Sequence, residues 1–153
     1  MVGSIGAATS SMSAEARSFV DTNVLVYAHD TTAGVKRDEA RAIVRDLWES
    51  RDGCVSVQVL QEFFVTATRK LAQPLETRTA ASAVEDFAQW RLHAPDAADV
   101  VAAIELHQRY DLSFWDAMII HSAAALGCGV LYSEDLNAGQ RYESVLVVDP
   151  FVS

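Results

Sequence analysis

In the stretch Phe19-Val20-Asp21-Thr22-Asn23, a short apolar run is followed directly by three polar side chains: an acid, a hydroxyl and an amide. An ionised carboxylate beside a β-branched run is costly to bury unless another group compensates its charge. Three later acids, Glu62, Asp116 and Asp135, also lie in apolar settings. If the fold gathers these four carboxylates, they require a cation, and a cation held by carboxylates is suited to phosphodiester chemistry.

Apolar periodicity along the rest of the chain alternates between short β-branched runs and longer segments with a 3.6-residue period. The short runs predict strands over residues 18–20, 54–57, 91–94, 130–132 and 145–148. The longer segments predict helices from near residue 24 and over residues 35–51, 59–71, 77–90, 97–110 and 114–126. Strands separated by helices favour right-handed crossovers, so we predict an α/β fold, a three-layer α/β/α sandwich around a mostly parallel sheet of about five strands.

Two of the four acids fall where such a sheet binds its ligands. Asp21 directly follows the first predicted strand, and Asp135 comes three residues after the strand at 130–132. Ligands of open α/β sheets bind beyond the carboxyl ends of the strands. We therefore expect both acids on that rim.

The 153 residues are enough for one domain. We expect residues 1–16 to form a disordered tail without the basic region of a signal peptide, and residues 17–153 to form the folded domain. No apolar run approaches the roughly 20 residues that span a bilayer, so we expect no membrane association. Cys54 and Cys128 lie in apolar contexts, and we expect them to be buried free thiols in a reducing cytoplasm.

The net charge of −9 argues against a protein that binds nucleic acid through a broadly basic surface. Binding of a nucleic-acid substrate would then depend on metal ions and a local basic patch that overcome the overall repulsion. An acidic protein would also suit a basic protein partner. Arg37, Arg41 and Arg45 recur every four residues, but neighbouring acids favour a salt-bridged, solvated helix face. Arg69 and Lys70, two turns after Glu62, are a second candidate patch.

Each acid also has an ordinary structural explanation. Asp21 is well placed to cap a helix that begins near residue 24. Glu62 lies about 60° from Val59 on a helical wheel, so it flanks the apolar stripe, and it is explained equally well as a solvated residue paired with Arg69 or Lys70. Asp116 follows Ser113 at capping-box spacing, although large apolar neighbours predict that this helix start is buried. Asp135 lies in a loop rich in Asp, Asn and Gly, which needs no function to explain it.

The neutral polar residues beside the acids are Thr22, Asn23 and Ser133. They are candidates for orienting the acids or contacting a phosphate, with local turn and cap hydrogen bonds as the alternative. No histidine is an obvious acid–base catalyst. His121 is interpreted as a helix-packing residue, and the other histidines share no sequence context.

Taken together, the order and contexts of the acids resemble the PIN-domain nucleases, in particular the VapC-type toxins of bacterial toxin–antitoxin pairs. The matching segments cover residues 19–25, 56–63, 112–119 and 133–139. Residues 147–151 resemble the closing strand of the family, with Asp149 where an Asn more often precedes Pro-Phe. The resemblance extends over about residues 17–153.

This resemblance implies a PIN-like fold and an endoribonuclease that binds Mg²⁺, or Mn²⁺, through Asp21, Glu62, Asp116 and Asp135, directly or through water. A water deprotonated with help from Glu62 or another acid would attack the phosphorus in line and leave a 3′-hydroxyl and a 5′-phosphate. Either one or two ions would suit this chemistry. A toxin of this type would be a cytoplasmic homodimer that is held inactive by a cognate antitoxin protein.

Other functions explain the same residues. A phosphatase of the haloacid-dehalogenase type requires an acid where Asn23 stands, and a phospho-receiver domain requires a late lysine that the chain lacks. A PIN-domain nuclease that processes RNA without an antitoxin, and a PIN-like scaffold that only binds a protein, remain open.

Overall fold

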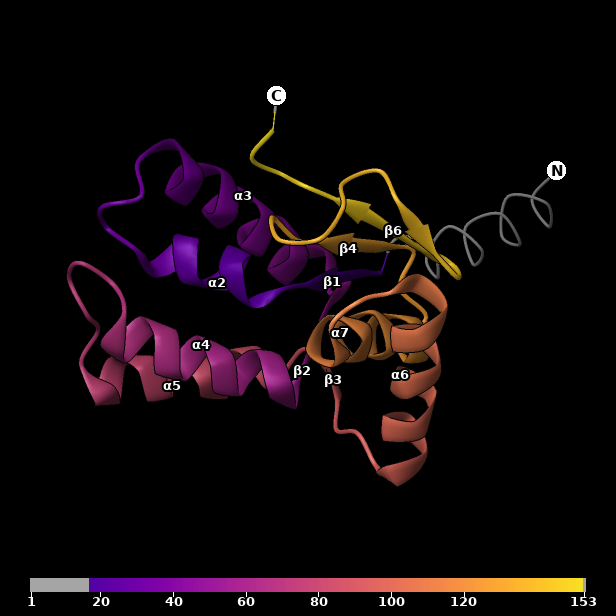
Figure 1. Ribbon diagram of the computed structural model, residues 1–153. Helices are drawn as coiled ribbons and strands as arrows, with labels where there is room; N and C mark the ends of the chain where they lie inside the picture. Colours follow the sequence, from indigo (N-terminus) through magenta and orange to yellow (C-terminus); the bar gives the residue numbers. More distant parts are fainter. Residues whose placement is uncertain (1–16, 153) are drawn as a thin grey trace, which may run out of the picture.

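The computed structural model describes residues 17–152, which form a six-stranded sheet between two layers of helices (Figure 1). The strands are β1 (Ser18–Val20), β2 (Gly53–Ser56), β3 (Arg91–His93), β4 (Val130–Tyr132), β5 (Arg141–Tyr142) and β6 (Val145–Val148). Their order is β3-β2-β1-β4-β6-β5, and every pairing is parallel except that of β5 with β6. The predicted tail, residues 1–16, lies outside the described residues.

Six helices connect the strands: α2 (Thr22–His29), α3 (Val35–Ser50), α4 (Val57–Arg69), α5 (Thr77–Phe87), α6 (Ala97–Tyr110) and α7 (Phe114–Ala125). The chain first moves outward from β1 to β2 and β3, and then returns past β1 to β4. Crossovers of one handedness place α2–α5 on one face of the sheet and the pair α6–α7 on the other, as Figure 1 shows. The predicted three-layer α/β/α class is therefore confirmed.

The sheet has one strand more than the predicted five. β5 contains only Arg141 and Tyr142, which turn back at Glu143, where φ is +54°, to pair with β6. Two residues cannot show an alternating pattern, which explains why the sequence did not predict this strand.

The core lies on both faces of the central strands. Phe19, Val20 and Leu131 of β1 and β4 are fully buried. Cys54 and Cys128 are buried and free, as predicted. Among the described residues, no helix is both long enough and apolar enough to cross a membrane.

The order of the strands reverses beside β1, so the crossovers diverge there and leave a crevice at the carboxyl ends of β1 and β4. The register pairs Val20 with Tyr132. The residues that follow these two strands, Asp21 and Ser133, therefore meet at the same edge.

We predict that Gly53→Ala destabilises the protein by about 1–3 kcal/mol. A Cβ at Gly53 would lie 2.6 Å from a ring atom of Trp90, whose side chain is only 8% exposed and has little room to move. Chemical denaturation of the wild type and the variant measures this decrease in the free energy of unfolding. If the overlap is the cause, Gly53→Ala costs less in a Trp90→Leu background, and an equal cost in both backgrounds would contradict this explanation.

Candidate active site: an acidic groove at the carboxyl edge of the sheet

An open groove of about 650 Å³ runs along the carboxyl ends of β1 and β4, between α2, α4 and the start of α7. Six acids line it: Asp21, Asp30, Glu62, Asp116, Glu134 and Asp135. Among the described lining residues, Lys70 is the one cation. The structure thus brings all four predicted acids to one groove with a strongly negative lining.

Asp21 is the most buried of these acids, with 7% of its surface exposed. Its Oδ1 accepts a hydrogen bond from the Thr22 amide at 2.7 Å, and its Oδ2 accepts one from the Ser133 hydroxyl at 2.7 Å. Burial raises the pKa of Asp21 to about 6, although the two hydrogen bonds oppose the shift and the nearby charges of Glu62 and Asp135 add to it. Asp21 is also the N-cap of α2, as its sequence position predicted. It therefore caps a helix and lines the groove at the same time.

Glu62 reaches the groove from α4. The Thr22 hydroxyl donates to its Oε1 at 2.9 Å, and the Gln58 amide donates to its Oε2 at 3.5 Å. Gln58 also donates to the Trp115 carbonyl at 3.4 Å, which links α4 to the start of α7. Glu62 is exposed, but within the described chain it forms no ion pair with Arg69 or Lys70. The expected alternative pairing is therefore not found.

Asp116 occupies the first turn of α7. Its backbone amide donates to the Ser113 hydroxyl at 3.1 Å, so Ser113 caps the helix as predicted. The prediction that this helix start is buried is wrong, because the Trp115 side chain is 62% exposed. Helix α7 turns its apolar residues toward the sheet only after its first turn. No described residue hydrogen-bonds the Asp116 carboxylate, which lines the groove.

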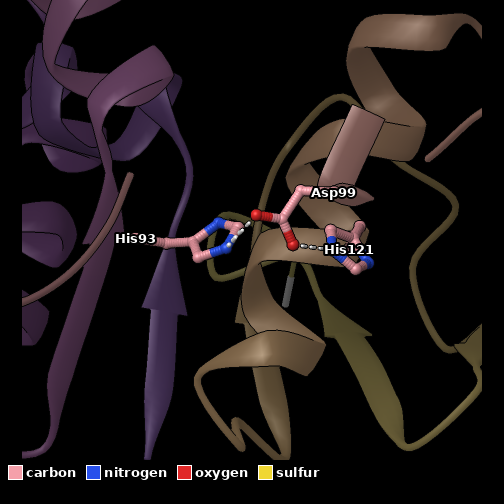
Figure 2. A group of neighbouring side chains, drawn as sticks. All are labelled: His93, Asp99 and His121. Atoms are coloured by element: carbon pink, nitrogen blue, oxygen red, sulfur yellow. Dashed lines mark hydrogen bonds and ion pairs between the residues drawn. The ribbon is translucent and has the colours of Figure 1, made fainter. Parts of the chain in front are cut away.

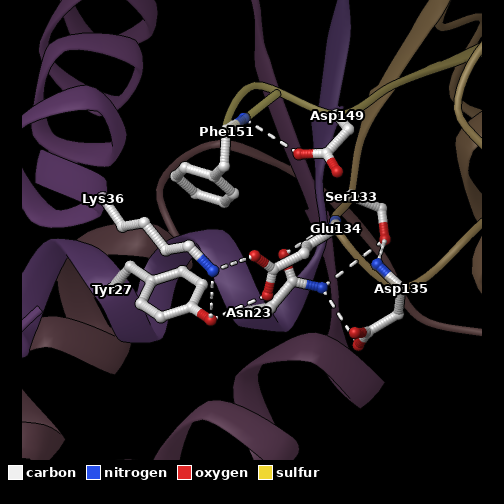
Figure 3. Close-up of polar contacts among 8 residues, drawn as sticks. All are labelled: Asn23, Tyr27, Lys36, Ser133, Glu134, Asp135, Asp149 and Phe151. Atoms are coloured by element: carbon white, nitrogen blue, oxygen red, sulfur yellow. Dashed lines mark hydrogen bonds and ion pairs between the residues drawn. The ribbon is translucent and has the colours of Figure 1, made fainter. Parts of the chain in front are cut away.

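Asn23 joins the start of α2 to the loop that carries Asp135 (Figure 3). Its Nδ2 donates to Asp135 Oδ2 at 3.2 Å and to Ser133 Oγ at 3.5 Å, and its Oδ1 accepts from the Glu134 amide at 3.1 Å. The Asp135 amide in turn donates to Ser133 Oγ at 3.2 Å. These contacts cross more than 100 residues of sequence, so Asn23 and Ser133 orient the acids, beyond any local turn or cap role.

Sequence reasoning missed the group around Glu134. Lys36 of α3 forms an ion pair with Glu134, and the Tyr27 hydroxyl donates to Glu134 Oε1 at 2.7 Å (Figure 3). The Phe151 ring packs edge-on against Tyr27 at 5.0 Å, and the Phe151 amide donates to Asp149. Glu134 is thus neutralised by a lysine, whereas Asp135 beside it is not. No local pattern could have paired Glu134 with a lysine 98 residues away.

The arginine face of α3 also differs from expectation. Within residues 17–152, Arg37, Arg41 and Arg45 form no ion pair, so the predicted salt-bridged face is not found. Of the second candidate patch, Lys70 lines the acidic groove, whereas Arg69 is not among the described residues that line it.

The donors in the groove fit a hard divalent cation. The side chains of the four acids, Asp21, Glu62, Asp116 and Asp135, offer only carboxylate oxygens, the ligands that Mg²⁺ prefers. Asp21 is a buried carboxylate that forms no ion pair within the described residues. Within residues 17–152, no three of these four carboxylates bring their oxygens within 4.8 Å of one another, whereas a different group of side chains does so. Mg²⁺ keeps several waters and needs only one or two carboxylates, which suits this spacing.

That other group consists of His93, Asp99 and His121 (Figure 2). His121 Nε2 lies 2.7 Å from Asp99 Oδ1, and His93 Nε2 lies 3.4 Å from Asp99 Oδ2. The hydrogen bond from His121 and that from the Asp96 amide hold the pKa of Asp99 at about 2. The sequence did not indicate this group, because its members meet only where the crossover from β3 through α6 to α7 brings them together.

The raised pKa of Asp21 predicts how the stability of the metal-free protein depends on pH. Between the unfolded value of 3.8 and the folded value of about 6, the native state binds more protons than the unfolded state, so stability falls as pH rises. Above this pH window, burial of the ionised Asp21 lowers the free energy of unfolding by a constant amount of about 3 kcal/mol. We therefore expect Asp21→Asn to stabilise the metal-free protein near neutral pH by about 1–3 kcal/mol, with a smaller gain toward pH 4.

Urea denaturation in EDTA, from about pH 4 to neutral pH, measures how much Asp21→Asn raises the free energy of unfolding. Asp46→Asn, which alters an exposed acid of α3, is the control and should change stability little. An Asp21→Asn protein that is no more stable than the wild type near neutral pH would contradict the cost assigned to this carboxylate.

Comparison with known proteins relates this geometry to a family. The sequence model of the PIN domain family matches residues 18–142 of this chain. The crystal structure of Mycobacterium tuberculosis VapC20, a sarcin–ricin loop cleaving toxin, superposes with a TM-score of 0.59 at 22% identity and covers 77% of this chain and 89% of that chain. No curated protein shows a significant sequence match. The structural likeness concerns the fold, and the family match spans most of the sequence, so this chain belongs to the PIN-domain family.

Proposed function

We propose that this protein is a metal-dependent endoribonuclease that hydrolyses RNA phosphodiester bonds, and that it is the toxin of a type II toxin–antitoxin pair. The observation that carries the proposal is the buried carboxylate of Asp21 at the carboxyl end of β1, facing a groove that Glu62, Asp116 and Asp135 also line. A cation would relieve the repulsion within such a concentration of negative charge, and RNA is itself an anion that the cation would attract.

The four acids have different environments, which suggests different roles. Asp21 is fixed by two hydrogen bonds, and the Asp116 carboxylate has no hydrogen bond from any residue between 17 and 152, so these two would hold Mg²⁺ or Mn²⁺ with Asp135. A bound divalent ion supplies charge that polarises a phosphate and lowers the pKa of water. The exposure of Glu62 and its hydrogen bond from Thr22 support a role as the base that accepts the proton of the attacking water.

The lining of the groove favours hydrolysis over attack by the RNA 2′-hydroxyl. Among its described residues there is no histidine to serve as the paired acid and base of a metal-free ribonuclease. In-line attack of water leaves a 3′-hydroxyl and a 5′-phosphate. The rim of the groove bears Trp115, which is 62% exposed and offers a face on which a base can stack. Lys70 would contact the phosphate backbone.

The toxin role rests on family resemblance and on charge. VapC20 is a sarcin–ricin loop cleaving toxin, which supports RNA as the substrate class. The net charge of −9 and the acidic groove suit a cognate antitoxin with a basic segment. We also propose a homodimer, since exposed Val100, Val101 and Ile104 give α6 an apolar surface that a second copy would cover. Action on cellular RNA would place the protein in the cytoplasm.

We predict that the purified protein cleaves a mixed RNA pool in Mg²⁺ or Mn²⁺ but not in EDTA. Asp21→Asn should lower the rate by about 100-fold or more, because it removes a charge that holds the cation. Asp46→Asn is the matched control and should cleave at the wild-type rate. Gel analysis gives the rates, and sequencing of the 5′-phosphate ends gives the sites.

Three results would each overturn the proposed chemistry. The first is cleavage that persists in EDTA and in Asp21→Asn. The second is a set of products with 2′,3′-cyclic phosphates. The third is loss of cleavage when a 2′-deoxynucleotide replaces the residue at the cut, since hydrolysis by water does not need that hydroxyl.

A further inference from the structure

We propose that His93, Asp99 and His121 form a second metal site, one that takes a transition-metal ion of the Zn²⁺ class and is distinct from the acidic groove. Two imidazoles and one carboxylate are a ligand set typical of Zn²⁺, which leaves one tetrahedral position for water. The acidic groove offers only oxygen ligands and so suits a different class of ion. This inference does not depend on the proposed nuclease activity.

The three ligand atoms already lie close to the arrangement that a metal requires. All lie within 4.8 Å of one another. Ligands of tetrahedral Zn²⁺ with bonds of about 2.0–2.1 Å are about 3.3 Å apart, so small rotations of the side chains would close the site. Figure 2 shows the Asp99 carboxylate between the two rings, with the Nε2 edge of each ring facing it.

The surroundings hold these side chains in place. His93 Nδ1 lies 2.8 Å from the hydroxyl of Ser122, which is fully buried. A proton on Nδ1 that is donated to Ser122 leaves the Nε2 lone pair directed at the metal position, as in known metal-bound histidines. The Asp96 amide donates to Asp99 Oδ2 at 2.9 Å and so fixes the carboxylate.

The ligands come from three different elements. His93 ends β3 at the edge of the sheet, Asp99 lies in the first turn of α6, and His121 lies on α7. Their side chains are 12%, 22% and 18% exposed, so the position is sheltered yet open to one water. A bound ion would therefore cross-link the edge strand to the α6–α7 pair and stabilise the helix that carries Asp116.

The test uses the chelator-treated full-length protein and Zn²⁺ or Co²⁺ alone as the probe. Calorimetry should show saturable binding of one Zn²⁺ at this site, and Co²⁺ should give the visible absorption of a tetrahedral complex. At Zn²⁺ about one hundred times the Kd, the Tm should rise by about 5–10 °C. His93→Gln and His121→Gln should each weaken binding at least about 10-fold.

His107→Gln is the matched control, because His107 is a histidine of α6 outside the cluster, and it should bind Zn²⁺ like the wild type. Binding should also survive in the double variant Asp21→Asn, Asp116→Asn, which disables the groove and so separates this site from the nuclease proposal. Imidazole ¹⁵N spectra of the wild type, which need no variant, should show two of the four histidines becoming metal ligands through Nε2.

Three results would each overturn the proposal. They are the absence of saturable binding, binding that survives both His93→Gln and His121→Gln, and ¹⁵N spectra in which Zn²⁺ leaves the rings of His93 and His121 unchanged.

Discussion

The structure around the groove depends on how the carboxylate of Asp21 is accommodated at the buried end of β1. One of its oxygens accepts from the first amide of α2, and the other accepts from Ser133 at the end of β4. The same group therefore starts a helix and ties two neighbouring parallel strands together at their carboxyl ends. These contacts reduce the cost of burying the charge but do not remove it, since the pKa remains raised to about 6. The remaining cost is what a cation in the groove would relieve.

The two residues after Asp21 extend this organisation to the other acids. Thr22 holds Glu62 of α4, and Asn23 holds Asp135 after β4. The three consecutive side chains thus contact two segments that are distant in sequence, α4 and the loop after β4, while Asp116 lies on α7. Because the polar triplet positions two acids and contributes a third, a change at any of its residues alters the whole groove rather than one ligand.

The sequence was sufficient for the parts of the structure that leave a local pattern. The strand ends predicted the rim positions of Asp21 and Asp135, and helical periodicity predicted the layers around the sheet. It was insufficient where contacts depend on how separate elements pack. The Lys36–Glu134 pair joins α3 to the loop after β4, and neither residue has a pattern that indicates the other. The cluster around Asp99 was missed for the same reason, because its members meet only after the crossover to α7 forms.

The central claim is that the charge of Asp21 is compensated by a divalent cation, and the pKa of this one carboxyl group tests it most directly. Titration of the Asp21 side chain by ¹³C NMR in EDTA should give a pKa of about 6. Saturating Mg²⁺ should lower that pKa below the ordinary aspartate value of about 3.9, because a cation favours the ionised form. A pKa that is the same with and without Mg²⁺ would contradict the claim.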